Sequence, residues 1–366
     1  MLTWLAILAF IAGHPGTVWD DPVPLDRVSG PDSLASGVTF SATGGSVTPT
    51  GLFTAGSAAG AYRVFALAGS ATDTAIVNVS VPPPAKPARS LAAAAATAAG
   101  SAKTPFGIFN VKPTELAPPF DVAVVAGEPE RLLGMLAAAQ RSGTKVIVNF
   151  AGGKYRNNFG LDGTFSFDVW KSREERFAGL DLAPYIADGT LMANYLIDEP
   201  HNRASWGRVV PYETLEQMAQ YSKSLWPGLT TITRTRVSWL DQARFKWTYL
   251  DAGWSQYSAN RGDVTAFRDT EVAAAHRSGL ALMFSLNISD GGEVVPGCYP
   301  GTRPVWCAMT AVELSRFGTV LGSAPTACGL TFWQYDRDYL GRSDIQAAVQ
   351  DVARVVAEHP AVPCRR

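Results

Sequence analysis

From Phe106 onward, short apolar runs alternate with longer segments whose apolar residues recur at helical spacing. Such runs are typical of parallel strands buried on both faces, and the amphipathic segments are typical of helices that cover a sheet. The expected strands are Phe106–Asn110, Asp121–Val125, Lys145–Phe150, Leu191–Ile197, Thr230–Thr235, Leu250–Tyr257, Leu280–Leu286 and Gly329–Tyr335. The expected helices are Pro129–Ser142, Arg173–Ile186, Tyr212–Leu225, Val264–Ser278, Ala311–Leu321 and Asp344–Glu358.

This alternation predicts an α/β fold. About eight repeats over about 260 residues fit a (β/α)8 TIM barrel, which we assign to residues 105–366. A doubly wound sheet shares the local pattern, but it normally carries a glycine-rich phosphate loop after its first strand. No such loop follows Phe106–Asn110, so the barrel is favoured.

Residues 1–104 follow a different pattern, because they contain no Glu and are rich in Ser, Thr, Gly, Ala and Val. Apolar and small polar residues alternate in Val38–Ala42, Tyr62–Leu67 and Ala75–Val81, and glycine-rich turns lie between them. Short alternating strands at this spacing predict a small all-β domain.

Within this domain, the segments SATGGSVTPTGLFTAG, GAYRVFALAG and DTAIVNVSV resemble the bacterial immunoglobulin-like modules of surface proteins. The match covers about residues 36–81, and we assign residues 17–81 to a partial module of this kind. The resemblance implies a β-sandwich whose early strands precede the match, where residues 1–35 supply them poorly.

Two further segments flank this module. Residues 1–16 contain the apolar run Leu2–Gly13, which has the length of a signal-peptide core but no Lys or Arg before it. A secretory signal and a misplaced start codon both fit this arrangement. Residues 82–104 combine a proline-rich stretch with an alanine run, and we interpret them as a linker.

Four cysteines occur, all in the last part of the chain. None has the Cys-x-x-Cys spacing of a zinc site, and no His pair flanks them. Their even number predicts two disulfides, Cys298–Cys307 and Cys328–Cys364, and therefore an oxidising compartment. We expect a secreted or cell-surface protein of bacterial type.

The net charge of the 366-residue chain is −1, and no basic segment is interleaved with aromatic residues. A nucleic-acid partner is therefore not expected. No apolar stretch has the length of a membrane span. We expect a monomer that uses neither a cofactor nor a metal.

Candidate chemistry gathers at the predicted strand ends, which carry the functional side chains of a TIM barrel. These ends are rich in polar and aromatic residues, a composition that a purely structural rim does not require. The candidates for substrate binding are Asn110, Asn149, His201, Arg234, Trp254, Gln256, Tyr257, Asn287, Trp333 and Tyr335.

The sharpest feature is Asp198-Glu199-Pro200, which follows the apolar run Tyr195–Ile197. Adjacent residues of a strand point in opposite directions, so we expect the two carboxyl groups to lie in different environments. One can then stay ionised while the other is held protonated, as acid/base catalysis requires. The structural alternative is a carboxylate that caps a helix or pairs with Arg234 or Arg236.

The segment YLIDEP, together with DAGWSQY and FWQYD at later strand ends, resembles the TIM-barrel glycoside hydrolases, whose acid/base Glu often precedes Pro. The resemblance, compatible with about residues 105–360, implies a carbohydrate substrate and Glu199 as the general acid/base. Two positions depart from the largest retaining clan of these enzymes. Its Asn is Asp198 here, and the penultimate strand Ala281–Ser289 ends without the nucleophilic Glu.

A two-carboxylate mechanism needs a partner about 5 Å from the acid for retention, or about 6.5–9.5 Å away for inversion. The candidates are Asp290, Asp336 and Glu293, and Asp251 ranks behind them. Alternatively, the Asp-Glu pair resembles that of substrate-assisted hexosaminidases. In that case Asp198 would orient an acetamido group of the sugar and Glu199 would be the acid.

Functions of other classes fit less well. A Gly-x-Ser-x-Gly elbow is absent and only four His occur, which disfavours a Ser-His-Asp esterase. The missing nucleophile supports a different alternative, in which the barrel binds a carbohydrate without cleaving it.

Overall fold

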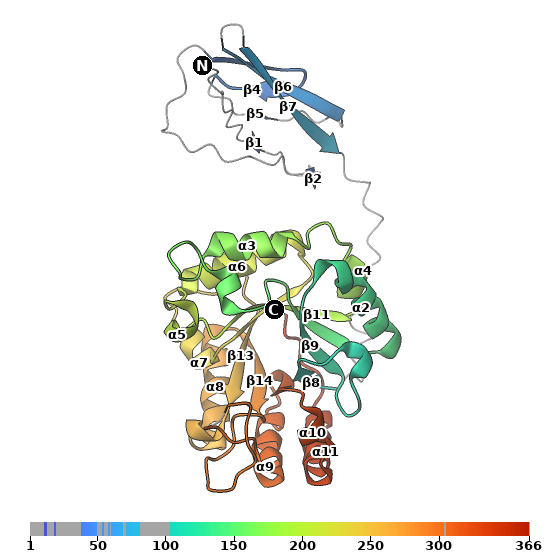
Figure 1. Cartoon of the computed structure of the whole chain (residues 1–366), viewed down its shortest axis with the longest axis vertical. Coiled ribbons are helices and arrows are strands. Elements are labelled where there is room, and N and C mark those ends of the chain that lie inside the picture. The colour runs from blue at the N-terminus through green and yellow to red at the C-terminus, as the bar shows by residue number, and fades with distance from the viewer. Residues whose placement is uncertain are drawn as a thin grey trace. The chain divides into compact units, whose positions relative to one another are not determined.

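The computed structural model describes residues 103–303 and 305–365 and, before them, residues 11–12, 18–19, 38–49, 53–54, 58, 60–68 and 71–80. The chain divides into two compact units, residues 1–94 and 95–366 (Figure 1). Apart from Ile11–Ala12, the segment 1–16 expected as a signal region lies outside the described residues, as does most of the linker 82–104.

The N-terminal unit is a small all-β unit. One sheet has the antiparallel order β2-β7-β6-β3, and a second has the order β1-β5-β4. Its core contains Phe53, Val64 and Val77, which are buried between neighbouring strands. The strands are β1 (Ile11–Ala12), β2 (Val18–Trp19), β3 (Val38–Ala42), β4 (Ser46–Val47), β5 (Phe53–Thr54), β6 (Gly60–Ala68) and β7 (Ala71–Ser80).

The second unit is a closed barrel of eight parallel strands in the order β10-β11-β12-β13-β14-β15-β8-β9, which confirms the predicted (β/α)8 fold. Each strand pairs with the next one along the chain, and β15 closes the ring against β8. The strands are β8 (Phe106–Phe109), β9 (Val122–Ala126), β10 (Lys145–Asn149), β11 (Leu191–Asp198), β12 (Thr230–Arg234), β13 (Ala252–Tyr257), β14 (Ala281–Asn287) and β15 (Ala327–Trp333).

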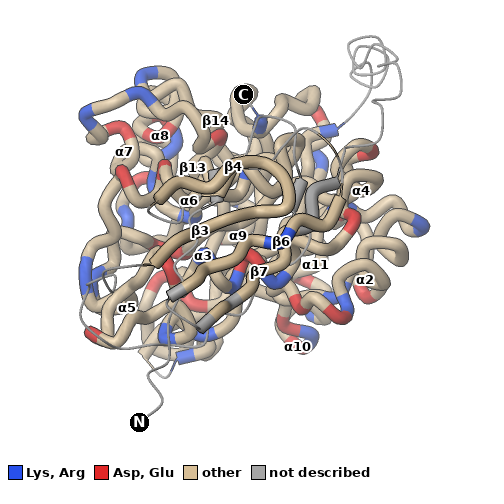
Figure 2. Tube along the Cα trace, turned by 90° about the horizontal axis from the view of Figure 1, so that it is seen from above, with Lys and Arg blue, Asp and Glu red and all other residues tan. Residues whose placement is uncertain are grey.

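Helices surround the barrel (Figure 1). The α-helices are α2 (Pro129–Ser142), α3 (Phe167–Glu175), α4 (Ala183–Ala187), α5 (Arg203–Trp206), α6 (Tyr212–Leu225), α7 (Val237–Leu240), α8 (Val264–Ser278), α9 (Ala311–Gly322), α10 (Arg337–Gly341) and α11 (Ser343–Ala357). The 3-10 helices are η1 (Pro113–Glu115), η2 (Tyr155–Asn158) and η3 (Ala259–Arg261). Acidic and basic residues are interspersed along the outer helices α2, α10 and α11 (Figure 2), as the small net charge leads one to expect.

One predicted helix, Arg173–Ile186, is wrong as a continuous element. Helix α3 ends at Glu175, and the short helix α4 begins only at Ala183. Pro184 lies in the first turn of α4, where its missing N–H is harmless. The same residue in the middle of a longer helix would remove a hydrogen bond and clash with the preceding turn.

The barrel interior is packed with side chains from alternate strand positions. Phe109 stacks on Trp254 with ring centroids 4.8 Å apart, and Tyr195 meets Trp254 edge-on. Gly107 lets β8 and β9 approach each other, because a Cβ there would lie 2.7 Å from Cβ of Val122. This packed interior leaves the space for a ligand at the strand ends.

Both predicted disulfides are confirmed. Cys328 at the start of β15 is bonded to Cys364 in the C-terminal tail. Cys298 and Cys307 close the long loop between β14 and α9. Within the described residues, no helix is long and apolar enough to cross a membrane.

Candidate active site

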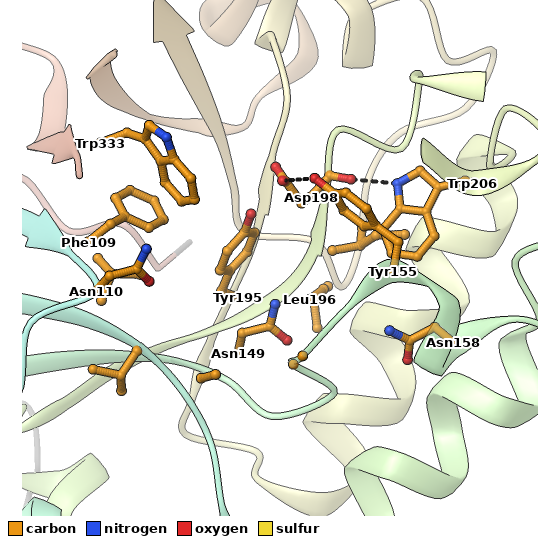
Figure 3. A pocket seen from close by; sticks show the side chains of 16 residues that line it. Phe109, Asn110, Asn149, Tyr155, Asn158, Tyr195, Leu196, Asp198, Trp206 and Trp333 are labelled. Atoms are coloured by element: carbon orange, nitrogen blue, oxygen red, sulfur yellow. Dashed lines mark hydrogen bonds between the residues drawn. The ribbon is translucent and has the colours of Figure 1, made fainter. Parts of the chain in front are cut away.

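A cleft of about 750 Å³ opens at the carboxyl ends of the barrel strands. It is lined mainly by polar and charged side chains, which come from the ends of β11, β12, β13 and β14 and from the loops that follow them. A smaller cavity of about 200 Å³ adjoins it and shares Tyr155, Asp198 and Trp333 with the cleft (Figure 3).

Asp198, the last residue of β11, is held by two other groups of the site. Arg234 at the end of β12 donates from Nε and Nη2 to Oδ1 of Asp198, each at 2.5 Å. The hydroxyl of Tyr155 donates to Oδ2 at 2.6 Å (Figure 3). Burial alone would raise the pKa of Asp198, but the charge of Arg234 and these hydrogen bonds hold that pKa below its ordinary value. Asp198 is therefore an ionised, fully engaged carboxylate.

The partners of Asp198 are themselves fixed by neighbouring side chains. The guanidinium of Arg234 lies over the ring of Trp333, 5.3 Å from its centroid, and Nε also contacts the Tyr195 hydroxyl at 3.2 Å. Tyr155 packs edge-on against Trp206, with ring centroids 4.8 Å apart. Burial and the charge of Asp198 raise the pKa of Tyr155, so its hydroxyl remains a donor.

Glu199 directly follows β11 and has an unusual backbone. Its φ is 41°, and Asn110 at the end of β8 has a φ of 62°. Within the described part of the chain, these two residues are the non-glycine positions in the left-handed region. A Glu in this region is strained, and such strain is concentrated at functional sites. Both left-handed positions lie at strand ends on the face that carries the cleft.

Two contacts hold Glu199 in place. Its backbone N–H donates to the Arg234 carbonyl at 2.8 Å. Asn202, the N-cap of α5, donates from Nδ2 to Oε2 of Glu199 at 3.1 Å. The carboxyl group is half-buried and lines the cleft. Asp198 and Glu199 thus lie in different environments, one engaged by a cation and the other open to a ligand.

Asp290 lines the same cleft as Glu199. It is nearly buried, and it accepts hydrogen bonds from the backbone N–H and the hydroxyl of Thr302, both at 2.6 Å. Its own N–H donates to Oδ1 of Asn287 at the end of β14. The loop closed by the Cys298–Cys307 disulfide therefore orients Asp290.

The other proposed partner carboxylates have different surroundings. Asp336 caps α10 by accepting from the Tyr339 N–H at 2.8 Å, and it lines a separate cavity. Glu293 forms an exposed ion pair with Arg316 at 2.9 Å. Asp251 precedes β13 and therefore lies at the opposite, amino end of the strands. None of the three lines the cleft of Glu199.

Several predicted binding residues line these cavities. Asn110 and Asn149 line the smaller cavity, and Gln256 and Asn287 line the cleft. Oδ1 of Asn149 and Nε2 of Gln256 are buried and have no hydrogen-bond partner among the residues that the structure describes. Buried polar atoms normally have partners, so these two atoms are available to a ligand.

Four predicted binding residues, Trp254, Tyr257, Tyr335 and His201, line neither cavity, which corrects the placement expected from sequence. Trp254 has no exposed surface, and its Nε1 donates to Thr331 Oγ1 inside the barrel. Tyr257 is buried against Phe267 and Phe317. Tyr335 lines a separate apolar cavity beside α11. Tyr257 turns outward from β13 into the helix layer, because successive side chains of a strand alternate in direction. Trp254 points inward like Gln256, but it lies deeper in the barrel, where it packs against Phe109 and Tyr195.

His201 bonds Thr235 rather than a group of the cleft. Its Nδ1 lies 2.8 Å from the Thr235 hydroxyl, and its ring packs near Trp239. Burial lowers the pKa of His201, so its ring is neutral at neutral pH.

Sequence reasoning missed Tyr155, Asn202 and Arg261, which all line the cleft. Tyr155 belongs to η2, in the long segment between β10 and α3, and the length of this segment is a signal of function. Asn202 is a typical N-cap residue directly after Pro200. Arg261 had no signal in the sequence. Among the described residues, no group of three or more His, Cys, Asp or Glu is arranged to hold a metal ion.

No protein-family model and no curated protein matches the sequence. Solved structures that resemble it include a family 18 chitinase from Pseudoalteromonas aurantia, at 13% identity and a TM-score of 0.42, over 68% of this chain and 100% of that one. A family 10 xylanase with a bacterial Ig-like domain, from termite gut, has 8% identity and a TM-score of 0.45, over 89% and 94%. Xylanase 10C of Cellvibrio japonicus, in complex with xylopentaose, has 12% identity and a TM-score of 0.45, over 82% and 75%. At these values the likeness carries no conclusion, and the barrel fold rests on the strand pairing given above.

Proposed function

We propose that this protein is an extracytoplasmic glycoside hydrolase in which Glu199 is the general acid/base. The observation that carries the proposal is the setting of Glu199. It has a strained backbone at the end of β11, and it faces a polar cleft of about 750 Å³. Within the described residues, Asn202 alone donates a hydrogen bond to its carboxyl group. A carboxyl group that the fold holds at such cost, but leaves open to a ligand, suits proton transfer to a leaving group.

Asp198 is a positioning residue in this proposal. Arg234 and Tyr155 occupy both of its carboxylate oxygens. It therefore has little capacity to orient an acetamido group, and the substrate-assisted mechanism is disfavoured. Asp198 keeps Arg234 in place, and the carbonyl of Arg234 in turn accepts from the Glu199 N–H.

Asp290 is the second carboxylate of the mechanism. It is the candidate that shares the cleft with Glu199, and the Thr302 hydrogen bonds fix its orientation. It would act as the nucleophile if the product keeps its anomeric configuration, and as the base that activates water if the configuration inverts. NMR of the first-formed product distinguishes these two outcomes.

A sugar is a suitable ligand for the remaining groups. The ring of Trp333 lines both cavities and offers an apolar face for stacking. Gln256 Nε2 and Asn149 Oδ1 offer one donor and one acceptor for hydroxyl groups. The two disulfides support a location in an oxidising compartment outside the cytoplasm.

Turnover of a panel of chromogenic glycosides and polysaccharides by the full chain tests the proposal. Glu199→Gln keeps the shape of the side chain but removes the acid, so we expect a loss of about 10²–10⁴-fold in kcat on the polysaccharides, whose sugar leaving groups need protonation. Asp290→Asn should lose activity to a similar extent. Glu358→Gln, an exposed residue after α11, is the matched control and should retain full activity. Carbohydrate binding without turnover would instead support the non-catalytic alternative.

A further inference from the structure

The cleft contains more positive charge than its own carboxylates balance. Four arginines line it, namely Arg234, Arg236, Arg261 and Arg303. The carboxylates that line it are Asp198, Glu199 and Asp290. Asp198 is already paired with Arg234, so three guanidinium groups remain for the other two carboxylates.

Arg236 and Arg261 line the cleft together with Glu199. Arg236 follows the end of β12, and Arg261 ends η3 after β13. Neither forms an ion pair within the described part of the chain. Burial and the neighbouring charge of Arg236 lower the pKa of Arg261. Two adjacent strands thus bring two like charges together beside the proposed acid.

The nearby buried carboxylate of Glu271 does not relieve this repulsion by pairing. Its oxygens accept hydrogen bonds from the Ser238 N–H, the Ser238 hydroxyl and the Ser255 hydroxyl, at 2.6–3.0 Å. These bonds tie α8 to α7 and β13, behind the cleft. The positive charge of Arg236 and Arg261 is therefore directed at whatever occupies the cleft.

We propose that the cleft binds a sugar residue that carries an anionic group, either a carboxylate or a sulfate, and that Arg236 and Arg261 hold this group beside the scissile bond. The inference rests on the proposed carbohydrate substrate and extends it to a chemical class. Guanidinium groups bind such oxyanions through paired, charge-assisted hydrogen bonds. An anion between the two arginines also removes their mutual repulsion, so binding energy comes from both effects.

Calorimetric binding to the full-length Glu199→Gln protein tests the inference without depending on turnover. The probes are oligosaccharides of one length: an oligouronide, a sulfated oligosaccharide and a neutral one. We expect at least one anionic probe to bind at least about tenfold more tightly than the neutral probe. Comparison of the two anionic probes identifies whether a carboxylate or a sulfate is preferred. Added salt should weaken that binding, because it screens exposed charges.

Substitution of single arginines tests whether Arg236 and Arg261 cause the preference for an anionic probe. Arg236→Gln and Arg261→Gln should each weaken the preferred anionic probe by about tenfold, which corresponds to about 1.4 kcal/mol. Arg141→Gln is the matched control, because Arg141 is an exposed arginine in the last turn of α2, at the opposite end of the barrel. Thermal unfolding of each variant verifies that it folds.

The inference is overturned if the neutral probe binds as tightly as both anionic probes, or if the cleft variants bind like Arg141→Gln. A different result would refute the proposed function and leave this inference standing. Arginine-dependent binding of an anionic probe, combined with no turnover of that probe by the wild type, would keep the inference and refute the hydrolase.

Discussion

Glu174 links the outer helices to the strand that carries the site, and its ionisation should control stability. This α3 residue has no exposed surface. Its Oε2 accepts from Asn194 Nδ2 at 2.7 Å, and Asn194 also donates to the Ser222 hydroxyl. Asn194 belongs to β11, which ends at Asp198. Burial raises the pKa of Glu174 to about 8, against an ordinary value of 4.5.

This raised pKa predicts a definite pH dependence. Below pH 4.5 the residue is protonated in both the folded and the unfolded chain, and it contributes no pH dependence. Between 4.5 and about 8 the unfolded chain releases the proton while the folded chain retains it, so stability falls as the pH rises. Each pH unit in this window corresponds to about 1.4 kcal/mol, and the whole window to about 5 kcal/mol.

Glu174→Gln removes the ionisation but keeps the size of the side chain and an oxygen for Asn194. Urea unfolding of the wild type and the variant should therefore give free energies that diverge with pH, with the variant gaining up to about 5 kcal/mol by pH 8. Glu175→Gln is the control, because Glu175 is exposed and pairs with Lys171 at the surface. Its difference from the wild type should stay nearly constant.

A difference between the wild type and Glu174→Gln that does not change between pH 4.5 and 8 would refute this reasoning. It would mean that the buried carboxyl group ionises in the folded protein as easily as in the unfolded one.

Two other predictions follow from pairs of residues in the barrel unit. Asp198→Asn leaves Arg234 as a buried cation without its counter-charge. Urea unfolding should therefore show that the free energy of unfolding falls by about 3–5 kcal/mol. A fall below about 1 kcal/mol would contradict the pairing. Replacing the Cys328–Cys364 disulfide by two serines should cost about 4 kcal/mol, against about 2.6 kcal/mol for Cys298–Cys307, because the first bond closes 36 residues and the second closes 9. The reverse order of the two unfolding midpoints would contradict this loop-length argument.

The barrel could be predicted from sequence because its signal is local. Apolar runs such as Lys145–Asn149 and the amphipathic helix Pro129–Ser142 have clear boundaries, and the latter ends at Gly143 in the left-handed conformation. The position of Glu199 at a strand end could be predicted from the same pattern, because the strand ends where the apolar run ends. Its left-handed backbone was not visible, because no residue type in Asp-Glu-Pro requires it.

The environment of each strand-end side chain could not be predicted in the same way. Trp254 and Gln256 are two residues apart on β13, yet Trp254 fills the barrel while Gln256 reaches the cleft beyond it. Arg261 and Tyr155 come from loops, and their positions depend on packing between distant segments. The balance of charge in the cleft is therefore a property of the folded chain.

The central claim is that Glu199 donates the proton to the leaving group, and leaving-group dependence tests it most directly. The measurement compares kcat/KM of wild type and Glu199→Gln for two glycosides of one sugar, one with a dinitrophenol leaving group and one with an alkyl alcohol. We predict a loss of about 100-fold or more for the alkyl glycoside, which needs the acid, and under about tenfold for the dinitrophenyl glycoside, which does not. An equal loss for both substrates, or no loss for either, would contradict the role of Glu199 as the acid.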